Sequence, residues 1–412
     1  MRRRKAEIVM GLDIGTTKIG ALIGEVQSDG MIEIIGVGTH PSRGLKKGVV
    51  VNIENTVESI RQAVEEAQIM AGIEVPSAYV GIAGGHITGI NSTGITVVKN
   101  REITLREINH VIDAARAVAL PMDREVIHVL PQEFIVDGQD GIMDPTGMTA
   151  MRLEAKVHIV TAAVTSAHNI VKCVNNAGLE VEDIVLEQLA SGAAVLTPEE
   201  REHGAVIIDL GGGTTDLALV LGDSVKHTAV LAVGGNHITN DLAFGLGTTV
   251  SEAERVKKTH GCTYSPLVDP YESVEIRSAE DRPGQKFTCR DLCDIIEPRV
   301  EEIFEMAHRE VSLSGYADRM PAGVVLTGGT ALLRGMVELA EEVFGGTVRC
   351  GVPQDIGGLV GMVNNPMYAT GVGLLQCGVK GLYSGQFHKF NDDHLFAKIY
   401  NRMRDWFGEF LT

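Results

Sequence analysis

One short motif occurs twice in this chain, about half a chain length apart. Asp13 opens the stretch Asp-Ile-Gly-Thr-Thr-Lys, and Asp209 opens the similar stretch Asp-Leu-Gly-Gly-Gly-Thr-Thr-Asp. The two aspartates are 196 positions apart in a chain of 412 residues. Each stretch lies between two apolar runs, which is the pattern of a β-hairpin with a tight turn. The repeat predicts two similar α/β halves, each presenting one such turn.

The residue types in these turns indicate a polyphosphate site. Glycines let backbone N–H groups come close to an anion, and threonine hydroxyls add donors. Asp13 and Asp209 are suited to hold Mg²⁺, directly or through water, because magnesium prefers carboxylate oxygens. Two ordinary hairpins with glycine turns are the alternative, which the paired occurrence disfavours. The predicted binding residues are Asp13, Gly15, Thr16, Thr17, Lys18, Gly211, Gly212, Gly213, Thr214 and Thr215.

Composition and charge exclude several classes of protein. Hydrophobic residues make up 44% of the chain and charged residues 22%, as in globular proteins. The net charge of −18 disfavours binding to nucleic acid, whose phosphates an acidic surface repels. The six cysteines show no metal-binding spacing and are predicted to be reduced thiols. Neither a secretory signal nor a run of about 18 apolar residues occurs, so we expect a cytosolic protein.

Apolar periodicity gives a coarse view of the remaining chain. A helix is predicted before Gly72, and a β-α-β-β unit is expected between residues 83 and 161, with its helix announced by the capping box of Thr104 and Glu107. A plain extension of the first domain is the alternative for that unit. We further expect a loop over 262–285 and a helix over 331–344.

These motifs together resemble those of the actin, Hsp70 and sugar-kinase ATPase superfamily. The stretches at 13–18 and 209–216 resemble its two phosphate motifs, and Leu-Thr-Gly-Gly-Thr-Ala at 326–331 resembles its adenosine motif, which includes Gly328 and Gly329. The resemblance implies ATP and Mg²⁺, with Asp209 as a catalytic residue. It also implies that Glu187 orients the attacking water, and that Glu254 and Lys257 contact ribose and adenine.

Within that superfamily the chain resembles the FtsA family of bacterial cell-division proteins over essentially its whole length. The fold implied is α/β and actin-like: two ribonuclease-H-like halves around a nucleotide cleft, an inserted α/β subdomain, and a C-terminal amphipathic helix. The expected ranges are 6–82, 162–203 and 364–378 for subdomain 1A, 83–161 for the inserted subdomain 1C, 204–245 and 322–363 for subdomain 2A, 246–321 for subdomain 2B, 379–393 for a linker and 394–412 for the helix.

The FtsA resemblance also implies partners and a location. Such a protein polymerises on the inner face of the cytoplasmic membrane at the division site, where it anchors filaments of the tubulin-like GTPase FtsZ and recruits later division proteins. The FtsZ C-terminal tail is expected to bind residues 246–321, with Arg299 and Glu302 as contact candidates; two solvated surface charges are the alternative. Slow ATP hydrolysis and ATP binding without hydrolysis both fit the sequence.

Residues 394–411 have the pattern of an amphipathic helix. Its apolar stripe consists of Phe396, Ile399, Met403, Trp406, Phe407 and Phe410. Aromatic residues on one face with basic residues beside it are typical of a helix that lies in a membrane interface. Docking of this helix on the protein's own core is the alternative.

Three other functions use the same fold. A sugar-kinase-type phosphotransferase leaves the terminal helix unexplained, and an Hsp70-like chaperone needs a substrate domain of about 200 residues after the ATPase core. An actin-like ATPase of pilus assembly is the strongest rival, since it shares the fold and an inserted subdomain.

Overall fold

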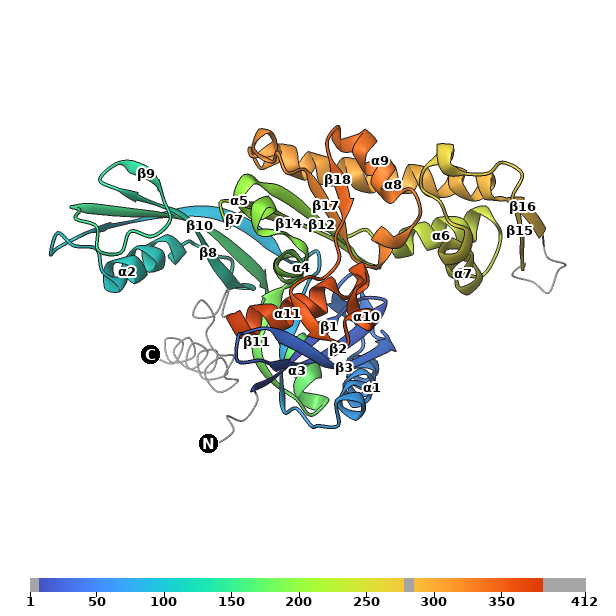
Figure 1. The fold of residues 1–412 in the computed structure, drawn as a ribbon, viewed down its shortest axis with the longest axis horizontal. Coiled ribbons are helices and arrows are strands. Elements are labelled where there is room, and N and C mark those ends of the chain that lie inside the picture. The colour runs from blue at the N-terminus through green and yellow to red at the C-terminus, as the bar shows by residue number, and fades with distance from the viewer. Residues whose placement is uncertain (1–6, 278–284, 381–412) are drawn as a thin grey trace, which may run out of the picture.

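The computed structural model describes residues 7–277 and 285–380. Figure 1 shows two main sheets with their helices in the middle of the molecule, a smaller sheet extending to one end, and a short hairpin at the other. The six residues of the predicted terminal stripe, and the helix and most of the linker expected there, lie outside the described residues.

The first main sheet holds the first copy of the repeated motif. Its strand order is β11-β6-β1-β2-β3-β19. The first three strands of the chain form an antiparallel meander, whereas β6, β11 and β19 join it in parallel. The strands are β1 (Glu7–Ile14), β2 (Lys18–Val26), β3 (Ile32–Pro41), β6 (Ser77–Ile82), β11 (Glu180–Leu186) and β19 (Ile356–Gly358).

The second main sheet repeats this arrangement. Its order is β14-β13-β12-β17-β18, again an antiparallel meander with two parallel strands beside the first strand of the motif. The strands are β12 (Ala205–Leu210), β13 (Thr215–Leu221), β14 (Ser224–Leu231), β17 (Val324–Thr327) and β18 (Val348–Cys350). The predicted two-fold repetition of the halves is therefore present in the strand order itself.

Helices cover both sheets and fill the space between them. Helices α4 (Glu187–Val195) and α11 (Ala369–Lys380) pack on each other and belong to an apolar core that takes in residues of both sheets. On the outer face of the first sheet lie α1 (Ile53–Ala71) and α3 (Val164–Asn176). The helices that share the outer core of the second sheet are α6 (Gly235–Gly245), α7 (Val250–His260), α8 (Cys289–Leu313) and α9 (Met336–Phe344).

The inserted unit is a four-stranded antiparallel sheet with one helix. The strand order is β7-β10-β8-β9, and α2 packs against it at the left of Figure 1. Its elements are β7 (Thr88–Val97), α2 (Leu105–Arg116), β8 (Arg124–Val136), β9 (Gln139–Ile142) and β10 (Arg152–Ala163). The predicted capping box is present, with the Thr104 N–H donating to Glu107 Oε2 at 3.2 Å. The expected β-α-β-β pattern omitted β9, whose polar and glycine residues give no strand signal.

Three details differ from the sequence prediction. The loop expected over 262–285 contains β15 (Ser273–Ile276), which pairs with β16 (Gln285–Thr288) and buries Val274 and Ile276. The helix expected from residue 331 starts only at Met336, because Gly335 has a φ of 88°, a left-handed backbone conformation that a right-handed helix cannot contain. Strand β19 already pairs with the first sheet, although residues up to 363 were expected in the second half.

The remaining short elements connect these layers. They are β4 (Leu45–Lys46), β5 (Val49–Val50), α5 (Pro198–His203), η1 (Ser265–Leu267), η2 (Ala317–Arg319), η3 (Gly329–Leu332), α10 (Val360–Val363) and η4 (Pro366–Tyr368). Among the described residues, no helix combines the length and the apolar character that crossing a membrane requires. The six cysteines all lie within the described ranges, and no two of them form a disulfide bond.

Candidate functional site

The two repeated turns meet face to face between the halves. Thr17 Oγ1 lies 3.4 Å from Asn236 Oδ1, at the start of α6. A Cβ atom on Gly212 would overlap with Thr17, and one on Gly213 would overlap with Thr16. The glycines of the second turn are therefore needed for the close approach of the two halves, and they leave backbone groups facing the space between them.

The second turn is held by backbone and hydroxyl groups from three segments. The Gly211 N–H donates to Thr214 O at 3.0 Å, which closes the turn. Gly235 N–H and Asn236 N–H, in the first turn of α6, donate to Gly211 O at 3.0 Å and to Gly212 O at 2.8 Å. Thr330 Oγ1, from η3, donates to the same Gly211 carbonyl at 2.9 Å. Hydrogen bonds within the protein therefore hold this turn in place.

Four carboxyl groups lie at the two turns: Asp13, Asp209 and Asp216 are buried, and Glu187 is half-buried. Burial and, after it, the charges of neighbouring carboxylates raise the pKa of Asp209 to about 6 and that of Asp216 to about 8. Burial, followed by the negative charges of Asp13 and Asp216, holds the pKa of Glu187 well above its usual range. Asp216 Oδ1 has no hydrogen-bond partner in the described part of the chain. Such a cluster suits a divalent cation, whose charge relieves the repulsion.

Lys18 places a positive charge beside this cluster. Its Nζ donates to Met367 O at 2.8 Å, lies 3.7 Å from Asp13 Oδ2, and sits 4.6 Å from the centre of the Tyr368 ring. Burial raises the pKa of Asp13, and the lysine partly offsets that rise. Two residues near the C-terminal end of the described chain, Met367 and Tyr368, thus hold the lysine at the first of the two turns.

The residues expected at the adenosine end line the same cavity, whose volume is 750 Å³. Lys257 Nζ forms an ion pair with Glu254 Oε2 at 2.6 Å on α7, and donates to Gly235 O at 3.1 Å. Gly328 and Gly329 lie opposite, at the start of η3. The cavity therefore extends from the four carboxyl groups to α7.

All but one of the predicted nucleotide-site residues line this cavity. Thr215 does not: it is fully buried, and its Oγ1 donates to Val233 O at 2.9 Å inside the second half. Sequence reasoning did not assign Asp216, Gly235, Asn236, Thr330 and Thr370, which also line it. Asp216 is the last residue of the second motif, so the motif could have identified it as a site residue. Thr330 likewise stands inside the motif at 326–331, whereas Gly235, Asn236 and Thr370 come from segments that only the fold brings to the cavity.

The predicted partner residues lie away from the cavity, on α8. Arg299 Nε forms an ion pair with Asp241 Oδ2 of α6 at 2.5 Å, and Arg299 also pairs with Glu302. The arginine side chain is 30% exposed and that of Glu302 is 52% exposed. Arg299 is therefore accessible but already paired with carboxylates of its own chain.

Comparison of the whole sequence with known proteins gives close relatives. The chain is 47% identical over 408 residues to the cell division protein FtsA of Pseudomonas aeruginosa, and the match covers 98% of both proteins. It belongs to the FtsA family. The FtsA of Escherichia coli is 39% identical over 387 residues, which is 92% of each protein. The family model described as cell division protein FtsA matches residues 206–373, and the SHS2 domain inserted in FtsA matches residues 84–161.

Solved structures with this fold are more distant in sequence. The PilM–PilN type IV pilus biogenesis complex contains a chain that is 17% identical, with a TM-score of 0.67 over 90% of this chain and 98% of that one. MreB5 of Spiroplasma citri bound to ADP is 16% identical, with a TM-score of 0.54 over 92% of this chain and 99% of that one. They show an actin-like fold. Since the FtsA relatives match at 39–47% identity, the chain is a cell-division protein.

Proposed function

We propose that this FtsA-family protein binds ATP with Mg²⁺ in the cavity between its halves. The single observation that supports this is the pair of glycine and threonine turns that meet beside four carboxyl groups, three of them buried. The turns supply N–H and hydroxyl donors for phosphate oxygens, and Lys18 supplies a positive charge. Asp13 and Asp209 would hold the magnesium ion, which neutralises phosphate charge when bound.

Glu187 is the proposed residue that orients an attacking water molecule. It is the first residue of α4 and lines the cavity near Asp13 and Asp216. Because its pKa is raised, the Glu187 carboxyl group tends to hold its own proton. It can accept a proton from water only when a nearby positive charge lowers that pKa. This dependence favours slow hydrolysis at most.

The nucleotide proposal is tested by separating the two turns. Gly212→Ala places a methyl group against Thr17, so the donors of both turns can no longer reach one phosphate chain at once. We expect Mg-ATP affinity to fall by about tenfold or more, the loss of one hydrogen bond to a charged group. Isothermal titration calorimetry gives the affinity. Gly346→Ala is the matched control, because a Cβ atom there meets open space. Equal Mg-ATP affinity in both variants would contradict the proposal that the two turns bind one phosphate chain together.

We also propose that the protein polymerises on the inner face of the membrane at the division site and anchors FtsZ filaments through the FtsZ C-terminal tail. Membership of the FtsA family supports this role, as does the amphipathic pattern at 394–412. We place the tail on the surface around α8, where Arg299 and Glu302 are accessible.

The tail site is tested on α8 itself. Arg299→Glu reverses the charge of a proposed contact residue. We expect the affinity for a labelled FtsZ C-terminal peptide to fall by about tenfold, which corresponds to the loss of one charge-assisted hydrogen bond. Fluorescence anisotropy with the full chain measures it. Arg309→Glu, an exposed arginine further along the same helix, is the control. If both variants bind as the unmodified protein does, the tail binds elsewhere.

A further inference from the structure

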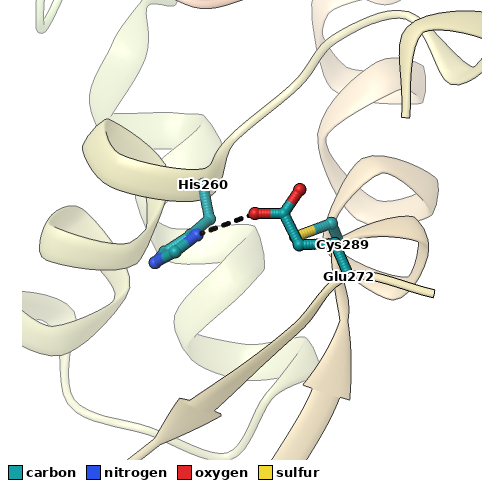
Figure 2. Close-up of side chains that lie close together, drawn as sticks. All are labelled: His260, Glu272 and Cys289. Carbon is teal, nitrogen blue, oxygen red and sulfur yellow. Dashed lines mark ion pairs between the residues drawn. The ribbon is translucent and has the colours of Figure 1, made fainter. Parts of the chain in front are cut away.

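A histidine, a glutamate and a cysteine lie together at the outer end of the second half, away from the nucleotide cavity. We propose that His260, Glu272 and Cys289 form a zinc site. One ligand atom from each residue lies within 4.8 Å of the other two. Figure 2 shows the His260 ring and the Glu272 carboxylate pointing toward each other, with the Cys289 sulfur beside the carboxylate; Nδ1 and Oε1 are 3.8 Å apart.

The fold brings these residues together from three elements. His260 is the last residue of α7, Glu272 directly precedes β15, and Cys289 is the first residue of α8. In the β15–β16 hairpin Ser273 pairs with Thr288, so Glu272 and Cys289 are the next residues across its open end. The Cys289 N–H donates to Glu272 O at 2.9 Å, which fixes their spacing.

The donor set suits zinc better than magnesium or calcium. A thiolate, an imidazole and a carboxylate are the three protein ligands that zinc takes, and tetrahedral zinc with bonds of about 2.0–2.3 Å holds its ligand atoms roughly 3.5 Å apart. The Cys289 side chain is buried and anchors one ligand, whereas the His260 and Glu272 side chains are 31% and 51% exposed. A small turn of these two side chains closes the remaining distance and leaves a fourth position for water.

The competing explanation of this cluster is a surface ion pair between His260 and Glu272. The role of Cys289 distinguishes the two explanations. An exposed histidine–carboxylate pair is worth little and needs no thiol. In an ion pair alone, the buried Cys289 side chain is only a neighbour of the Glu272 carboxylate. In a zinc site the same sulfur is an essential ligand.

Metal titration of the full chain tests the site. We expect one Zn²⁺ to bind in the presence of excess Mg²⁺, which occupies the carboxylates of the nucleotide cavity. Cys289→Ser should weaken Zn²⁺ binding by at least about tenfold, since even an outer partner of a metal ligand is worth that much. Co²⁺ should give a thiolate charge-transfer band in the near ultraviolet that Cys289→Ser abolishes. Cys350→Ser, which removes an exposed thiol elsewhere, should leave both signals unchanged.

A second variant covers the case in which a change at the buried cysteine disturbs folding. His260→Gln alters a partly exposed side chain, so the fold should survive while Zn²⁺ affinity drops; His110→Gln, at an exposed position on α2, is its control. Failure of the unmodified chain to bind Zn²⁺, or equal binding by His260→Gln and His110→Gln, would overturn the site. Neither result bears on ATP binding, which uses other residues.

Discussion

Burial of Asp209 and Asp216 makes the stability of the protein depend on pH. Their pKa values in the fold are about 6 and about 8, whereas an aspartate in an unfolded chain titrates near 3.9. At pH values between the unfolded pKa and the folded pKa of each group, the folded state therefore holds more protons than the unfolded state. The contribution of these two groups to stability is therefore fully present below about pH 4 and is lost as the pH rises toward 8.

Asp216→Asn should remove part of this dependence. We expect the variant to melt at a higher temperature than the unmodified protein, by about 2–4 °C for each kcal/mol of repulsion relieved, with the difference growing from pH 5 to pH 8. Thermal denaturation without divalent cations measures this. Asp318→Asn, at an exposed position, should show no such trend. Parallel curves for Asp216→Asn and the unmodified protein would contradict the raised pKa.

At the residue scale, the motif predicted the cavity well because glycine and threonine encode the turns locally. Thr215 was predicted to line the cavity but does not, because successive side chains of a strand point to opposite faces of the sheet. It is the first residue of β13, and its side chain donates to Val233 O away from the cavity. Asn236 and Thr370 could not be predicted, since tertiary packing alone brings them beside the motifs, whereas Thr330 stands inside the motif at 326–331.

At the scale of elements, the capping box of α2 offers a direct test of a local sequence signal. Thr104 accepts from the Arg106 N–H at 3.3 Å, and the Glu107 carboxylate accepts from the Thr104 N–H. Thr104→Ala should cost about 1 kcal/mol of helix stability, so the amides of residues 105–108 should exchange hydrogen about fivefold faster. Thr259→Ala, inside α7 and not at a cap, should leave those amides unchanged. Unaltered exchange in Thr104→Ala would show that the cap carries no stability.

The elements that sequence reasoning missed are short ones whose partners are distant or weakly patterned. Strand β15 shows alternation at only Val274 and Ile276, which is too little to separate it from a loop. Strand β19 forms only by pairing with the edge strand β3, which lies more than 300 residues earlier in the chain. The long amphipathic helix α1, by contrast, ends at Gly72 as predicted, because Gly72 has a φ of 68° and caps the helix.

At the scale of the whole molecule, the motif repeat reflects a repeat of topology. Both main sheets place their motif hairpin at the centre, next to a parallel strand, so the two turns emerge at the same edge of each half. The core between the sheets, built on α4 and α11, joins the halves below the cavity. A ligand that spans both turns would therefore bind the two halves together, so the proposed nucleotide binding would depend on the whole chain.

Membrane attachment is the second proposed property of the whole molecule, and the amphipathic sequence pattern predicts that residues 394–412 provide it. Burying each of the six stripe residues is worth roughly 1.5–3 kcal/mol, a gross figure of order 10 kcal/mol that the entropy of ordering the segment reduces. Lys398, Arg402 and Arg404 outnumber Asp405 and Glu409 by a single charge. Hydrophobic insertion should therefore dominate over attraction to anionic lipid, and raised salt should weaken attachment only modestly.

Deleting residues 394–412, or changing Trp406 to Glu, should release the protein from liposomes in a sedimentation assay while ATP binding survives. Filaments should bind more tightly than monomers, because many helices then engage the membrane at once. The control is Lys398→Ala, which removes one basic residue beside the stripe and should leave most of the protein in the pellet. Co-sedimentation of the truncated chain, or loss of its fold by circular dichroism, would mean that the helix packs on the protein's own core. In that case the stripe would bury its aromatic side chains against the body of the protein, and attachment at the division site would depend on protein partners.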